Sequence, residues 1–196
     1  MLVSVQDVRR CLEQVVEVRD HYRQNVLNGD AVRKSIDQLR WIIETYLQKV
    51  VKVEDVEWKA KTIAAMALAI RDGSYEIYIL QGLSDDARRF AYCKELFHVV
   101  IDEVEARTMS IYAHLEEVLA TFPVDDSQPR KSTVSERLAE AAAMEFLFPY
   151  TDRLHFIGTA KDGVLDFEGC GAKRGVPPHL IELYCSDSYM DFFGKF

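Results

Sequence analysis

The chain has 196 residues, 48% of them hydrophobic, and a formal net charge of −8 at pH 7. This length and composition suit one domain with a substantial core, alone or with a small helical appendage. The negative charge excludes a general attraction to nucleic acid or to anionic lipid, so we expect neither as a direct partner. The longest apolar run, residues 63–70, is too short to span a bilayer, and we expect no membrane segment.

The cysteines point to a reducing compartment. Cys11, Cys93, Cys170 and Cys185 form no C-x-x-C pair and match no zinc-ribbon spacing. We expect four reduced thiols, and with them a cytoplasmic protein, because stable disulfides are rare in the cytosol. The first residues also lack the long apolar core of a secretory signal peptide.

Two helices are predicted at the start of the chain. Apolar residues recur at helical spacing over residues 5–26 and again over residues 31–50. Between them, Asn28-Gly29 can end one helix and Asp30 can begin the next. We therefore predict an N-terminal helical hairpin at residues 1–50, followed by a second domain at residues 51–196. The apolar stripes of the hairpin can pack on that domain or on a second copy in a homodimer.

A small antiparallel sheet and more helices are predicted next. Two β-prone runs, residues 66–70 and 75–80, flank Asp72-Gly73, which is a favoured turn pair. A helix begins near Asp86, and another ends at Pro149 because proline cannot continue a helix. Helices, then a small sheet, then helices indicate the α+β class, with a mostly helical domain.

Residues 94–98, KELFH, differ by one residue from the zinc-peptidase motif H-E-x-x-H. In that motif two histidines at i and i+4 point to one side of a helix and bind zinc, and the glutamate acts as general base on the metal-bound water. In this sequence Glu95 holds the position of the base and His98 that of the second histidine. Lys94 replaces the first histidine.

Lysine changes the chemistry of such a site. Its amine binds zinc only after losing a proton from a reference pKa of about 10.4, so imidazole, thiolate and carboxylate are much better ligands near pH 7. The Lys94 ammonium would instead supply positive charge where the zinc would lie. It could hold the neighbouring carboxylates without a metal, since buried carboxylates without a cation are costly.

Residues 77–102, IYILQGLSDDARRFAYCKELFHVVID, resemble the core of the ImmA/IrrE-type metallopeptidases, a zincin-like family. Lys94 departs from the family motif, and Phe97 stands where the family has glycine. The segments at residues 136–149 and 175–184 are similar to the family's later helix and closing helix, so the resemblance covers residues 50–184. The positions that match the family's first helix are Arg88, Arg89, Phe90, Glu95, Leu96 and His98.

The resemblance implies a third zinc ligand, a glutamate on the later helix. Counting back from Pro149 without gaps reaches Leu138, whereas matching the local sequence selects Glu140. Glu136 is a further alternative. A shifted site is also open, because Asp102 lies four residues after His98 and the pair could bind zinc or manganese with a carboxylate of the later helix.

Three hypotheses follow. In members with an intact site, the resemblance implies cleavage of a helix-turn-helix repressor in phage or mobile-element regulation. We favour a catalytically altered pseudoenzyme that needs no cofactor and binds a protein or peptide partner, such as a transcriptional repressor. The alternative is an active zinc-dependent endopeptidase with Glu95 as base and His98 as ligand. The third is a structural role through the N-terminal hairpin.

Overall fold

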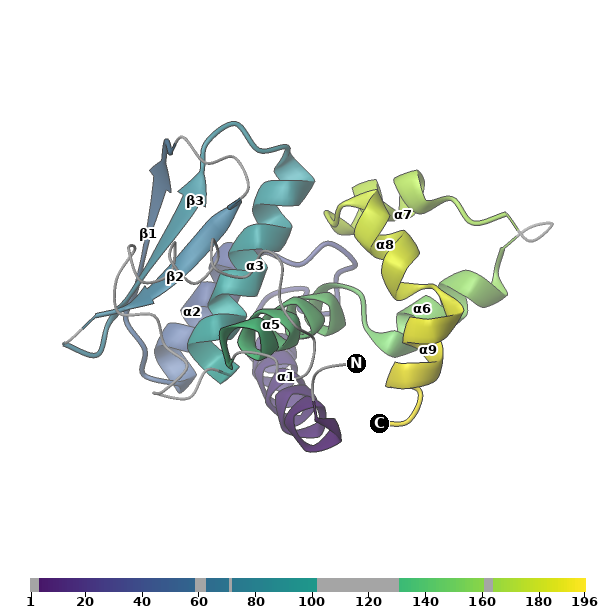
Figure 1. Ribbon diagram of the computed structural model, residues 1–196, viewed down its shortest axis with the longest axis horizontal. Helices are drawn as coiled ribbons and strands as arrows, with labels where there is room; N and C mark the ends of the chain where they lie inside the picture. Colours follow the sequence, from purple (N-terminus) through teal and green to yellow (C-terminus); the bar gives the residue numbers. More distant parts are fainter. Residues whose placement is uncertain (1–3, 59–62, 71, 102–130, 161–163) are drawn as a thin grey trace.

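The computed structural model describes residues 4–58, 63–70, 72–101, 131–160 and 164–196. Figure 1 shows the sheet at one end of the molecule and the C-terminal helices α6–α9 at the other, with α3 and α5 between them. The predicted α+β class is confirmed. No described helix is long and apolar enough to cross a membrane.

The elements are α1 (Val5–Asn25), α2 (Ile36–Tyr46), β1 (Val51–Val56), β2 (Ala65–Ala69), β3 (Tyr75–Leu80), α3 (Asp85–Ile101), α5 (Lys131–Leu147), α6 (Tyr150–Gly158), α7 (Phe167–Arg174), α8 (Pro178–Tyr184) and α9 (Asp187–Phe193).

The sheet is mixed, which corrects the prediction of an antiparallel sheet. Its order is β1-β3-β2, with β2 antiparallel and β1 parallel to the central strand β3. The chain reverses once between β1 and β2 and again between β2 and β3. Two reversals leave β1 and β3 running in the same direction, and β3 pairs with both neighbours.

The predicted hairpin is present between β2 and β3. The Ile70 backbone N–H donates to the Ser74 carbonyl at 2.8 Å, and the Asp72 carboxylate accepts the Ser74 N–H at 2.9 Å. Gly73 has φ +86°, a left-handed conformation that glycine adopts without the steric cost of a Cβ atom. The Asp-Gly pair therefore fixes the register of the two strands.

Serine side chains cap the first turn of three of the described helices. The Ser4 side chain accepts the backbone N–H of Asp7, and that of Ser35 accepts the N–H of Gln38. Ser84 does the same at the start of α3, where two aspartates occupy the first turn and complement the helix dipole. These caps satisfy backbone donors that have no partner within the helix.

Helix α3 is the centre of the protein. It packs on β2 and β3 on one side and on α5 on another, and α1 and α2 also contact it. Cys93, Leu96 and Phe97 are fully buried on this helix. On α5, the fully buried Ala139, Ala142 and Ala143 present small side chains, which allows two helices to approach closely. The N-terminal helices share this core, since α1 packs on α5 and α2 on α3.

Arg153 on α6 is the largest fully buried side chain. It forms an ion pair with Glu145 and donates to the Phe148 carbonyl at 2.8 Å. Its guanidinium also lies over the rings of Tyr184 and Phe193, at 5.7 and 5.3 Å from their centres. One buried cation therefore joins α5, α6, α8 and α9.

We expect Glu145→Ala to lower the free energy of unfolding by about 3–5 kcal/mol, because it leaves the Arg153 charge buried without its partner. Urea denaturation measures the change. The matched control is Asp30→Asn, which breaks the exposed pair with Arg23 and should change stability by no more than about 1 kcal/mol. Equal effects of the two substitutions would contradict the central role of Arg153.

Lys34, in the linker between α1 and α2, is also buried, with 7% of its surface exposed. Among the described residues its ammonium has no hydrogen-bond acceptor and no ion pair, and it lies over the Phe146 ring, 5.6 Å from the ring centre. Burial, followed by the charge of Arg174, lowers the pKa of Lys34 from 10.5 to about 8. The charges of Asp152, Arg19 and Arg23 also act on it.

This shift gives a pH dependence with a defined sign. Above pH 8 the folded protein releases a proton that the unfolded chain keeps until pH 10.5, so stability should rise with pH across that window. In chloride buffer, Lys34→Met should be more stable than the wild type at pH 7 by about 3 kcal/mol. The difference, measured by urea denaturation, should shrink between pH 8 and 10.5. A difference that stays constant with pH would contradict the assignment.

Candidate functional site

The Lys94 ammonium lies between two carboxylates. Its Nζ atom is 3.0 Å from Glu95 Oε1 on the same helix and 2.7 Å from Glu136 Oε2 on α5. The Glu95 side chain is 2% exposed and that of Lys94 is 20% exposed, so water screens this pair of charges weakly. Lys94 thus supplies the cation that a buried Glu95 carboxylate requires.

His98 joins the same cluster one turn further along α3. Residues at i and i+4 lie on one side of a helix, so His98 and Lys94 both reach α5. His98 Nε2 is 3.2 Å from Glu136 Oε1, and Nδ1 is 3.1 Å from the Ser135 hydroxyl. Each oxygen of Glu136 therefore meets one residue of the KELFH segment.

The electrostatics favour the charged forms of Lys94 and Glu136. Burial alone would lower the pKa of Lys94, but the charges of Glu95 and Glu136 and their hydrogen bonds raise it well above its ordinary value. Burial would raise the pKa of Glu136, but the interactions with His98 and Lys94 bring it well below the ordinary value. The cluster therefore keeps an ammonium and a carboxylate in contact across the neutral pH range.

The structure places the candidate third ligands in different surroundings. Glu136 lies beside His98, as one of the alternatives requires. Glu140, one turn later on α5, accepts a hydrogen bond from the Tyr184 hydroxyl at 3.1 Å and thus contacts α8. Asp102 lies outside the described residues. Of the carboxylates on the later helix, the structure therefore brings Glu136 into the KELFH cluster.

The residues of this cluster do not fit a zinc ion. Within the described part of the chain, no group of three or more His, Cys, Asp and Glu side chains is arranged to hold a metal. The Lys94 ammonium contacts both Glu95 and Glu136, and it carries three N–H donors and no lone pair. It repels a second cation at these oxygens.

Ser135 is a member of the cluster that was not among the candidate residues in the sequence. It lies buried inside α5, and its hydroxyl meets His98. Partners of this kind fix the orientation of an imidazole ring in metal sites and elsewhere. The signal in the sequence that could have identified Ser135 is its position next to Glu136. Both side chains contact His98.

Comparisons with known proteins add a weak likeness in fold. No protein-family model matches the sequence, and no curated protein does. Among solved structures, the chain is similar to a Mycobacterium tuberculosis transcriptional regulator, with a TM-score of 0.46 and 17% sequence identity. The match covers 86% of this chain and 50% of that one, so this chain spans half the length of the regulator.

The role of Lys94 can be tested by a double-mutant cycle. Lys94→Met should lower the free energy of unfolding by about 3–5 kcal/mol, because Glu95 then remains buried without a cation. Adding Glu95→Gln should recover part of that loss, and urea denaturation of the two single variants and the double variant measures the coupling. Arg88→Met removes an exposed pair with Asp55 and serves as the control. Strictly additive effects at Lys94 and Glu95 would contradict the coupling.

Proposed function

We propose that the chain is a pseudopeptidase of the ImmA/IrrE type, which needs no metal and acts as a regulatory binding module for a protein partner. One observation carries the proposal. The Lys94 ammonium contacts Glu95 at 3.0 Å and Glu136 at 2.7 Å. The resemblance implies a zinc ion at this place, bound by two residues of the motif helix and by a glutamate of the later helix.

The remaining residues of the cluster support this interpretation. Glu95, His98 and Glu136 are the residue types of a zincin site, and they come from the two helices that the resemblance specifies. The residue that departs from the motif supplies the missing positive charge. The site therefore keeps its carboxylates together without metal, whereas a simple loss of the first histidine would leave them to repel one another.

Binding of a partner is the activity that such a scaffold retains. Among the described strands, β1 and β2 each pair only with β3, so each has one edge without a strand partner. An extended segment of another protein can add to a sheet edge through backbone hydrogen bonds. Following the resemblance, we propose a transcriptional repressor of the helix-turn-helix class as the partner.

Metal content distinguishes this proposal from the endopeptidase alternative. Wild-type protein that is loaded with zinc and dialysed should retain far less than one zinc per chain by elemental analysis. Lys94→His should raise retention toward one zinc per chain, because it restores the better ligand beside His98 and Glu136. Adding Glu136→Gln should remove that gain, whereas adding Glu140→Gln should not, since Glu140 contacts Tyr184.

The opposite result in these experiments would favour the endopeptidase alternative. Stoichiometric zinc in the wild type, lost on His98→Ala, contradicts a metal-independent site. Zinc-dependent cleavage of a helix-turn-helix repressor that disappears in Glu95→Gln has the same consequence, because it assigns Glu95 the role of general base.

A further inference from the structure

Two large aromatic side chains of α2 lie outside the hydrophobic core. Trp41 has 47% of its surface exposed and Tyr46 has 38%, whereas the opposite side of the helix buries Leu39, Ile42 and Ile43. Single exposed apolar side chains are common on protein surfaces. These two are in contact, with ring centres 6.5 Å apart and ring planes at 87°. The core does not account for this exposed pair.

A third ring, from α1, completes the group. His21 stacks on Tyr46, with ring centres 4.2 Å apart and an interplanar angle of 22°. We call His21, Trp41 and Tyr46 the aromatic cluster. The helices that carry it pack on one another and on the core. Rings that are already in contact lose little conformational freedom when a partner binds, so the cluster is preorganised for binding.

The positively charged side chains nearest to Trp41 and Tyr46 in the sequence are engaged elsewhere. Arg40 Nε lies 3.7 Å from Glu44 Oε2, one turn along α2. Lys49 Nζ lies over the ring of the buried Tyr75, 5.8 Å from its centre. In the described part of the chain, no cation lies over the Trp41 ring. The exposed indole is therefore open to a cation from outside.

Two exposed carboxylates flank the aromatic cluster. Asp37 precedes Trp41 by four residues on α2, and Glu17 precedes His21 by four residues on α1. Residues at this spacing lie on the same side of a helix, so each acid is next to one ring of the cluster. Neither carboxylate forms an ion pair or a hydrogen bond with another described residue. Both acids are therefore available to a ligand.

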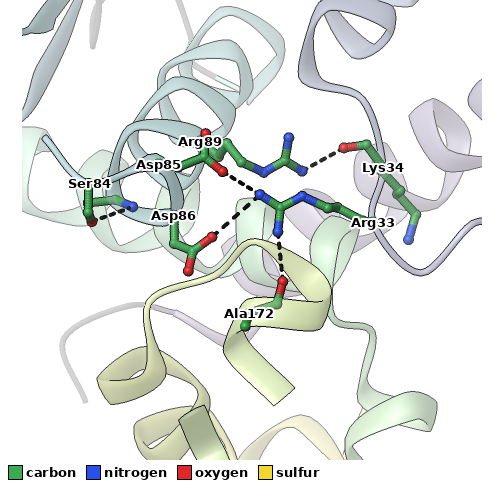
Figure 2. A network of polar contacts seen from close by, with 8 residues as sticks. Arg33, Lys34, Ser84, Asp85, Asp86, Arg89 and Ala172 are labelled. Carbon is green, nitrogen blue, oxygen red and sulfur yellow. Dashed lines mark hydrogen bonds and ion pairs between the residues drawn. The ribbon is translucent and has the colours of Figure 1, made fainter. Parts of the chain in front are cut away.

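The acids at the start of α3 provide a comparison. Asp85 and Asp86 both form ion pairs with the Arg33 guanidinium, as Figure 2 shows. The acids beside the aromatic cluster have no such internal partner, in a chain whose formal net charge is −8. The charge that complements this surface is positive, and another molecule would supply it.

We propose that the aromatic cluster, with Asp37 and Glu17, binds an arginine side chain in a basic segment of the protein partner, an inference that rests on the proposed function and names the chemistry of that partner. A guanidinium stacks on aromatic faces, best on an indole, and donates to carboxylates at the same time. Tryptophan and tyrosine are enriched among the residues that contribute most to protein–protein binding. Proteins that bind nucleic acid carry such basic surfaces, which agrees with a transcriptional repressor as the partner.

A short synthetic peptide of arginine, glycine and serine is the probe, and the same peptide with citrulline in place of arginine is its neutral match. The chain has two tryptophans, so Trp58→Phe leaves Trp41 as the fluorescent reporter. We expect the arginine peptide to cause a saturable change in this fluorescence at low ionic strength, and the citrulline peptide to cause none. Added salt should weaken binding, because it screens exposed charges.

Substitutions distinguish the aromatic cluster from a general attraction to an acidic protein. Trp41→Leu keeps apolar surface without the ring, so it should weaken binding of a fluorescein-labelled arginine peptide about threefold to tenfold. Asp37→Asn should weaken binding and reduce its salt dependence. Val164→Ala, at an exposed apolar residue between α6 and α7, is the control and should bind as the wild type does. Circular dichroism should show unchanged helix content in Trp41→Leu, since Trp41 lies outside the core.

Equal binding of the arginine and citrulline peptides, or equal affinities of Trp41→Leu and Val164→Ala, would overturn the proposal. A wild-type dimer in sedimentation that becomes a monomer in Trp41→Leu would also overturn it, because a second copy would then cover the aromatic cluster. Zinc retention keeps this test separate from that of the proposed function. Low zinc retention without peptide binding removes the basic partner and leaves the metal-free site, whereas stoichiometric zinc with peptide binding does the reverse.

Discussion

The enclosure of α3 constrains the rest of the structure. This helix has the sheet on one side and α5 on another, and α1 and α2 also contact it. A charged side chain at its midpoint must therefore meet an opposite charge inside the protein, because burying an isolated ion is very costly. Lys94 and Glu95 meet that requirement together with Glu136, so the polar contacts of α3 and α5 determine how the two central helices are aligned.

Three cations that are largely shielded from solvent in the described part of the chain show three ways to place charge away from water. Arg153 combines a carboxylate with aromatic rings and joins the C-terminal helices. Lys94 shares two carboxylates, one of them on another helix. Lys34 lies over the Phe146 ring but has no carboxylate partner among the described residues, and of the three it is the one whose pKa moves toward neutrality.

Local signals allowed much of this fold to be predicted. Asp72-Gly73 located the hairpin, because few residue pairs suit such a turn, and Pro149 marked the end of a helix. Helical spacing placed Lys94, Glu95 and His98 on one helix. The parallel pairing of β1 could not be predicted, since it depends on which strand lies in the centre of the sheet and not on the composition of any strand.

The candidate site was harder to predict because it depends on how two helices cross. Glu136 and Glu140 are one turn apart on α5, and sequence spacing alone treats them alike. Only the packing of α5 on α3 decides that Glu136 reaches His98 while Glu140 reaches Tyr184. The burial of Lys34 could not be predicted either. It depends on contacts of the linker with α5 and α7, and each of these helices lies more than a hundred positions after the linker in the sequence.

The covalent attachment of the Lys94 charge has a consequence for the protein in the cell. A zinc-stabilised domain gains its cation from outside, so its folding depends on metal supply and chelators destabilise it. The ammonium between Glu95 and Glu136 is part of the polypeptide and is present as soon as the chain has been synthesised. The stability that this ammonium provides therefore does not depend on the supply of zinc.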